Sequence, residues 1–108
     1  MVDILPYLEG IRKKVSEGSL HREFESFNRT VLFDFPDTGK QYALKFAGGK
    51  AELIAGKIDR SDISVSTNSD VLANILDKKT NPVTAYVSRK IKVKGEMQDL
   101  LKLQKLMG

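Results

Sequence analysis

The sequence predicts an α+β fold in which helices cover one face of a five-stranded, mostly antiparallel sheet. Three features support this prediction. Five segments carry apolar residues at alternate positions, which is typical of strands with one buried face. Both ends of the chain carry apolar residues at helical spacing. Between the fourth and fifth strand segments lie the 23 residues from Asn68 to Lys90, which leave room for further helices.

The first 18 residues predict an amphipathic helix. One stripe is formed by four apolar residues spaced four, three and four apart, namely Ile4, Leu8, Ile11 and Val15. Asp3 is placed to cap the start of this helix, and Gly18 to end it. We therefore expect a surface helix that packs one face inward.

Three strands follow as an antiparallel meander, at residues 30–35, 41–46 and 51–56. Residues 36–40 form the first turn, and Gly48 and Gly49 supply the positive φ angles of a two-residue hairpin. Alternation places large side chains of the first two strands on one face, including Phe33, Phe35, Leu44 and Phe46. That face is expected to be buried.

A fourth strand is predicted at residues 62–67, and Asn68 or Ser69 is placed to cap a helix that reaches about residue 79. Asn81-Pro82 ends this helix and starts a second, short one. The fifth strand, residues 91–95, places Ile91 and Val93 inward. The long connection before it is sufficient for a crossover that would make strands four and five parallel.

The terminal helix, from Met97, is more apolar than a covering helix needs to be. At 100° per residue its apolar positions spread over about 220°, against roughly 100° for a helix that only covers a core. These positions are Leu100, Leu101, Leu103, Leu106 and Met107. Two interpretations remain open: a dimer contact or deep burial of the helix end, and the wall or lid of an apolar cavity to which Met107 contributes adaptable packing.

Length and composition indicate one domain spanning residues 1–108 with one core, because 108 residues is near the usual domain size. With no cysteine and a single histidine, the chain has no disulfides, thiolate metal sites or cysteine nucleophile. It has no apolar run of about 18 residues to span a bilayer and no secretion signal, so we expect a cytoplasmic protein. No nucleophile or acid-base set indicates an enzyme.

The order of segments from residue 30 to residue 107, and several short motifs within it, resemble the sterol carrier protein 2 family. That family has an Asn-Pro turn, a short helix with Ala-Phe, a lysine-alternating strand that ends in glycine, and a leucine-rich helix. The corresponding residues here are Lys79, Asn81, Pro82, Ala85, Tyr86, Lys90, Lys92, Lys94, Gly95, Met97, Leu100, Lys102 and Leu103. Lys78 and Arg89 stand where the family often has glycine, which predicts that these two turns differ in shape.

The resemblance implies a lipid-binding and lipid-transfer protein that carries a fatty acyl, acyl-CoA, isoprenoid or sterol-like ligand in an apolar tunnel between sheet and helices. It implies no cofactor and no catalysis. Ordinary core packing is the alternative role for each candidate tunnel residue. The candidate ligand-binding residues are Phe33, Phe35, Leu44, Phe46, Val83, Tyr86, Val87, Leu100, Leu103 and Met107.

Four basic residues precede and occupy the fifth strand: Arg89, Lys90, Lys92 and Lys94. Lysines on an exposed strand commonly prevent aggregation, which is one interpretation. The other is transient docking to an anionic membrane, where each lysine contributes about 1 kcal/mol. The aromatic residues alternate away from these lysines, which argues against a stacking platform for nucleic acid.

The alternative function is a homodimeric interaction or accessory domain that uses the apolar terminal helix without transporting lipid. The sequence is compatible with a monomer or a homodimer.

Overall fold

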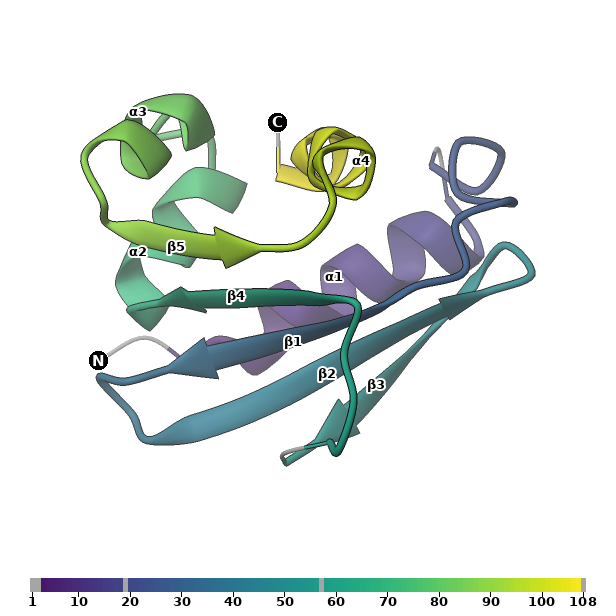
Figure 1. Cartoon of the computed structure of the whole chain (residues 1–108), viewed down its shortest axis with the longest axis horizontal. Coiled ribbons are helices and arrows are strands. Elements are labelled where there is room, and N and C mark those ends of the chain that lie inside the picture. The colour runs from purple at the N-terminus through teal and green to yellow at the C-terminus, as the bar shows by residue number, and fades with distance from the viewer. Residues whose placement is uncertain (1–2, 19, 57, 108) are drawn as a thin grey trace.

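The computed structural model describes residues 3–18, 20–56 and 58–107, the side chain of Met107 excepted. This part of the chain contains four helices and five strands, which follow one another in the predicted order (Figure 1). The helices are α1 (Leu5–Ser16), α2 (Ser69–Leu76), α3 (Pro82–Val87) and α4 (Met97–Met107). The strands are β1 (Thr30–Phe35), β2 (Lys40–Ala47), β3 (Lys50–Ala55), β4 (Ile63–Thr67) and β5 (Ile91–Lys94). No helix among these residues is long and apolar enough to cross a membrane.

The five strands form one sheet in the order β3-β2-β1-β4-β5. The predicted meander of β1, β2 and β3 is confirmed, and Gly48 and Gly49 have the expected positive φ angles of 58° and 79°. After β3 the chain crosses to the other side of β1, where β4 pairs with β1 in parallel. The crossover expected between β4 and β5 does not make them parallel. These two strands are antiparallel, because α2 and α3 bring the chain back to the end of the sheet where β4 finished.

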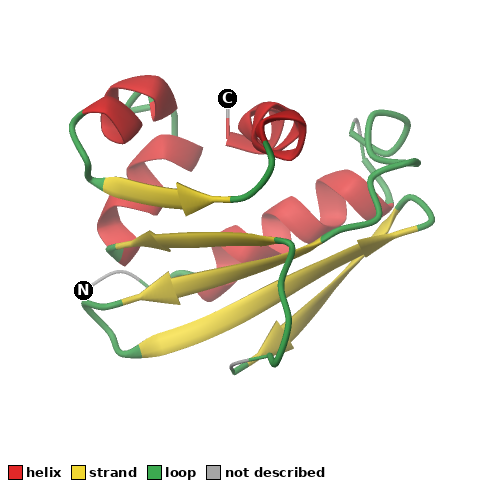
Figure 2. Cartoon of the chain, viewed as in Figure 1, coloured by secondary structure: helices red, strands yellow, loops and turns green. Residues whose placement is uncertain are grey.

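One face of the sheet carries the core. Val31 of β1 pairs with Leu44 of β2 and Ile63 of β4, and all three side chains are fully buried. The helices lie behind this sheet and above β5, where α3 and α4 flank the edge of the sheet (Figure 2). The position of α3 and α4 at the β5 edge determines where an apolar cavity can form.

Two helices are followed by a residue that has left-handed backbone angles but is not glycine. Lys78, after α2, has φ 63°, and Arg89, after α3, has φ 60°. The Lys79 amide donates to the Asn74 carbonyl oxygen at 2.8 Å and the Lys90 amide to the Ala85 carbonyl oxygen at 2.9 Å, as in a Schellman turn. The expectation that these turns differ in shape is therefore wrong. They keep the backbone that glycine favours, at a cost of roughly 1–2 kcal/mol each.

The starts of α2 and α3 are capped differently. Asn68 occupies the capping position of α2 without a side-chain hydrogen bond, and Asp37 from the β1–β2 turn acts in its place. Its carboxylate accepts from the Ser69 amide at 3.0 Å and from the Ser69 hydroxyl at 2.5 Å. Asn81 caps α3, since its side-chain oxygen accepts from the Val83 amide at 2.8 Å. The β1–β2 turn thus fixes the position of α2, and Asn81 fixes the start of α3.

Candidate functional site

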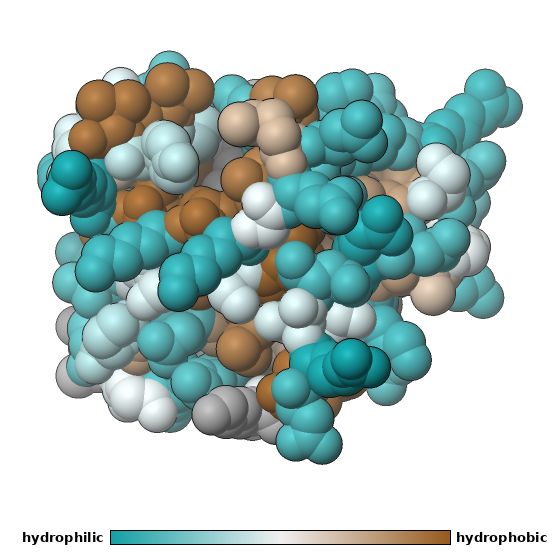
Figure 3. Space-filling view, in the orientation of Figure 1, coloured by the Kyte–Doolittle hydropathy of each residue, from teal (hydrophilic) through white to brown (hydrophobic). Residues whose placement is uncertain are grey.

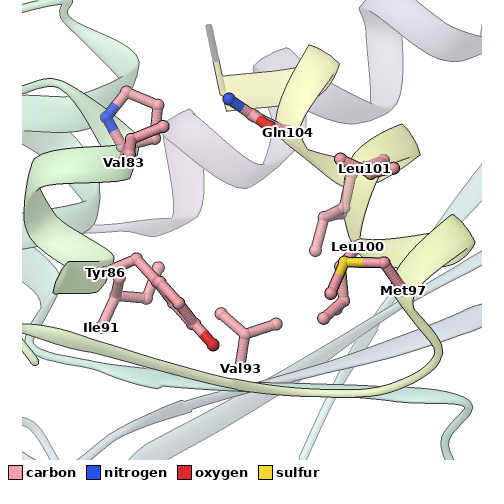
Figure 4. A pocket seen from close by; sticks show the side chains of 10 residues that line it. Val83, Tyr86, Ile91, Val93, Met97, Leu100, Leu101 and Gln104 are labelled. Carbon is pink, nitrogen blue, oxygen red and sulfur yellow. The ribbon is translucent and has the colours of Figure 1, made fainter.

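An apolar cleft of about 190 Å³ lies between α3, β5 and α4 (Figure 4). In this view side chains of α3 and α4 face each other across the space, and β5 forms its floor. The lining consists of Pro82, Val83, Tyr86, Ile91, Val93, Met97, Leu100, Leu101, Leu103 and Gln104. None of these side chains is charged, and the only side-chain polar groups in the lining are the Tyr86 hydroxyl and the Gln104 amide. The cleft is therefore suited to an apolar ligand with at most one small polar group inside.

Local structure explains how α3 and β5 provide two sides of the cleft. Asn81 and Pro82 start α3, and the spacing of three residues places Val83 and Tyr86 on the same side of that helix. In β5 the alternation of side chains directs Ile91 and Val93 toward the cleft, so the lysines between and after them face away. Sequence alternation thus separates an apolar face from a basic one.

Gly95 redirects the chain from β5 into α4. Its φ of 155° is one that side-chain-bearing residues rarely adopt. A Cβ atom there would lie 3.2 Å from Ile63 Cγ1 and 3.4 Å from Leu100 Cδ2. Glycine at this position therefore lets α4 begin close to the floor of the cleft.

The unusual apolar width of α4 has two structural uses. Leu103 and Leu106 are buried, with 3% and 4% of their surface exposed. Leu100 and Leu101 line the cleft, and Leu101 is 57% exposed. The helix therefore covers the core with one side and forms a cleft wall with the next.

Polar contacts attach α4 to the segment that follows α1. Arg29 Nε donates to Asp99 Oδ2 at 3.0 Å, and this carboxylate raises the pKa of Arg29. Lys105 Nζ lies 2.9 Å from Glu23 Oε2, and its hydrogen bond lowers the pKa of Glu23. Lys102 Nζ lies 5.4 Å from the centre of the Phe24 ring, within range of a cation-π contact. These contacts attach α4 to residues 23–29.

The structure divides the candidate ligand-binding residues into two main groups. Val83, Tyr86, Leu100 and Leu103 line the cleft. Phe33, Phe35, Leu44 and Phe46 do not; they are at most 2% exposed and lie within the core. Phe33 stacks on Phe35 with ring centres 6.3 Å apart. The predicted face is correct, but β1 and β2 lie away from the edge strand β5 that forms the cleft floor.

Two candidates fall in neither group. Val87 is 73% exposed and is not among the lining residues. Met107 belongs to the last turn of α4, but its side chain lies outside the described part of the chain. The family resemblance implied an apolar tunnel between sheet and helices, and the structure describes an open cleft at the β5 edge of the sheet.

The sequence interpretation did not include six lining residues among the candidates: Pro82, Ile91, Val93, Met97, Leu101 and Gln104. The sequence carried an apolar signal for three of them. Ile91 and Val93 are the inward positions of their strand, and Leu101 belongs to the broad apolar arc of α4. Gln104 had no apolar signal, but it lies one helical turn after Leu100, on the same side of α4.

Arg89, Lys90, Lys92 and Lys94 are all exposed. In the described part of the chain none of them lies within 4.0 Å of an acidic side chain. Within the same described ranges, no group of three or more His, Cys, Asp or Glu residues is arranged to hold a metal ion. These four basic residues lie outside the cleft, since none of them is among its lining residues.

Comparisons with known proteins agree with this geometry. The profile of the SCP-2 sterol transfer family matches residues 8–108. None of the curated proteins matches the sequence. The solved structure of sterol carrier protein domain 2 of Helicoverpa armigera aligns with a TM-score of 0.78 at 18% identity, over 96% of this chain and 84% of that one. Sterol Carrier Protein 2 from Yarrowia lipolytica, in its apo form, gives 0.71 at 18% identity, over 99% and 93%.

A double mutant of the sec-alkyl sulfatase PisA1 aligns with a TM-score of 0.80 at 18% identity and covers 94% of this chain. The chain spans only 16% of that much longer enzyme. At these identities the structural matches establish a shared fold, and the family assignment depends on the sequence profile.

Proposed function

Because the chain belongs to the SCP-2 sterol transfer family, we propose that residues 1–108 form one domain that binds a lipid in the cleft between α3, β5 and α4 and carries it through the cytoplasm. Membership of this family supports lipid binding and transfer in general. The observation that carries this more specific proposal is the composition of the cleft: among the described residues ten line it, and none of these ten is charged. The ligand classes we propose are fatty acids, acyl-CoAs, isoprenoids and sterol-like lipids.

Energetics favour a carrier of this kind. An acyl chain of about 16 carbons gains roughly 13 kcal/mol on leaving water, at about 0.8 kcal/mol per methylene. Relative to a bilayer interior the gain nearly cancels, because both environments are apolar. A dry cleft with adaptable side chains is therefore sufficient to accept and to release a lipid.

The polar groups of the cleft restrict where a head group is placed. The Tyr86 hydroxyl and the Gln104 amide can each form a hydrogen bond with a neutral oxygen. An ionised carboxylate inside the cleft would have no cation among the lining residues and would be costly to bury. We expect the head group of a fatty acid or acyl-CoA to lie at the mouth of the cleft.

The volume of the cleft requires it to open. About 190 Å³ is below the roughly 300–1,000 Å³ that is usual for ligand pockets. A long lipid therefore needs α3 and α4 to separate, or it leaves part of its chain outside. The buried aromatic residues Phe33, Phe35 and Phe46, with Leu44, are proposed to support the deeper end of an opened cleft.

The test is a titration with an environment-sensitive fluorescent fatty acid, displaced by an unlabelled one. We expect saturable binding with a stoichiometry near one. Leu101→Arg places a charge in the cleft wall and is expected to weaken binding at least tenfold. Leu5→Arg is the matched control, since Leu5 is also an exposed helical leucine, at 39%, but lies on α1.

Failure to bind fatty acids, acyl-CoAs, isoprenoids and sterols would overturn the proposal. Equal affinity in the two arginine variants would overturn the assignment to this cleft. A dimer in light scattering that becomes a monomer in Leu101→Arg, without any lipid binding, would favour the homodimeric accessory domain instead.

A further inference from the structure

Most of the exposed large apolar side chains in the described part of the chain lie beside the cleft. Val83, Tyr86 and Val87 are 51%, 55% and 73% exposed and occupy one side of α3. Met97 and Leu101 are 70% and 57% exposed and lie one turn apart on α4. We call these five residues the apolar rim. Single exposed apolar residues are ordinary, but a grouped patch indicates an interaction surface.

Basic side chains adjoin the apolar rim. Figure 3 shows hydrophobic residues over α3 and between α3 and α4, with hydrophilic residues directly below them over β5. From residue 83 to residue 101 the chain has four basic residues and two acidic ones, Glu96 and Asp99. Asp99 is already paired with Arg29. This surface therefore combines exposed apolar area with unpaired positive charge.

This combination distinguishes between possible partners. A surface with apolar side chains bordered by cations on its β5 side fits the boundary of a bilayer that contains anionic lipids. A second copy of the chain, packed by twofold symmetry on the apolar rim, would bring the basic residues of both copies near each other. That arrangement is electrostatically unfavourable. The charge of the surface thus selects a membrane over a homodimer.

We propose that the apolar rim inserts into the surface of anionic membranes, so that the mouth of the cleft opens directly into the bilayer. Val87, which does not line the cleft, then has a role as the most exposed residue of the inserting surface. A lipid can pass from the bilayer into the cleft without its chain crossing water. This inference rests on the proposed carrier function for its purpose, but insertion itself is measurable without any ligand.

Tryptophan reporters test the insertion, because the chain contains no tryptophan. Val87→Trp places a reporter on the apolar rim, and Met97→Trp is a second one on α4. Ala55→Trp is the control, since Ala55 is exposed on β3, at the opposite edge of the sheet. Each variant is mixed with vesicles of equal parts phosphatidylcholine and phosphatidylserine, with and without brominated acyl chains.

We expect blue-shifted emission and at least about twofold quenching by the brominated lipids for both rim reporters, and neither effect for Ala55→Trp. Vesicles of phosphatidylcholine alone should give weaker binding, by about fivefold for each lysine that contacts the surface. Rim reporters that stay water-exposed on anionic vesicles would overturn the inference. Blue-shifted emission that depends on protein concentration without vesicles would also overturn it, because a second copy would then cover the rim.

The two proposals fail separately. If the rim inserts but the fluorescent titration shows no ligand binding, the carrier function is refuted and membrane insertion stands. If ligand binds but the rim does not insert, membrane insertion is refuted and the carrier function stands.

Discussion

Leu103 belongs both to the buried core and to the lining of the proposed lipid-binding cleft. It is 3% exposed, lies on α4 and belongs to the cleft lining. Leu103→Ala removes three carbons and so about 2.4 kcal/mol of transfer free energy, at about 0.8 kcal/mol each. A closed cavity would raise the loss to as much as about 5 kcal/mol. Because this void joins an existing cleft, we expect a loss of about 2–3 kcal/mol in the free energy of unfolding.

Leu72→Ala provides the matched control. Leu72 lies on α2, is fully buried and does not line the cleft. Its removal leaves a closed cavity, for which we expect a loss of about 3–5 kcal/mol. Urea unfolding followed by circular dichroism measures both variants, with and without a fatty acid.

The effect of ligand separates the two variants. At about 100 times its dissociation constant a ligand stabilises the native state by about 2.7 kcal/mol. We expect a larger gain for Leu103→Ala than for Leu72→Ala at the same fatty acid concentration, because the ligand can fill the space that Leu103 leaves. Equal ligand gains, together with a loss of about 4 kcal/mol or more for Leu103→Ala, would show that Leu103 is only a core residue and would refute this reasoning.

Three further predictions concern charge and backbone. The Ser69 hydroxyl lowers the pKa of Asp37 below 3.8, so the stability that Asp37 contributes is complete above that pH and is lost as the pH falls through the lowered pKa. In acid unfolding curves, Asp37→Asn should remove this pH-dependent loss of stability. An unchanged curve would contradict the role of the Asp37 carboxylate as the cap of α2. Lys78→Gly should raise the free energy of unfolding in urea by about 0.5–1 kcal/mol, because glycine relieves the strain of the left-handed backbone but adds entropy to the unfolded state. A lower free energy of unfolding would show that Lys78 is not strained. Replacing Lys90, Lys92 and Lys94 by Gln should slow lipid transfer to anionic vesicles at low salt and leave ligand affinity nearly unchanged; unchanged transfer would assign the lysines to solubility.

Much of the fold follows from local patterns. Alternation in residues 30–35 and 41–46 predicted both the strands and the face that is buried, because each side chain's face depends only on the period of two. The stripe of Leu8, Ile11 and Val15 predicted the buried side of α1 in the same way. The direction of pairing did not follow, since β4 joins β1 in parallel through contacts that no local pattern encodes.

The candidate site was harder to predict because it depends on strand order. Phe33 and Val93 are both inward residues of their strands, and only the sheet order shows that β5 forms the cleft floor while β1 is central. The sequence also did not predict the segment that packs against α4. In the sequence, residues 19–25 are mostly polar, yet Phe24 is fully buried and the centre of its ring lies 5.9 Å from that of Phe46. A polar segment with one aromatic anchor carries no periodic signal.

Methyl NMR of the protein during a titration with an unlabelled fatty acid tests most directly whether lipid binds in the cleft. The account predicts that a fatty acid added to the protein shifts the methyl signals of Val83, Val93, Leu100 and Leu101, which line the cleft, in proportion to the bound fraction. Methyl signals of Ile11 and Val15, which α1 buries on the far side of the core, should move little. Shifts confined to α1 or to the outer face of the sheet, with the cleft signals unmoved at saturation, would show that lipid binds elsewhere and would contradict the account.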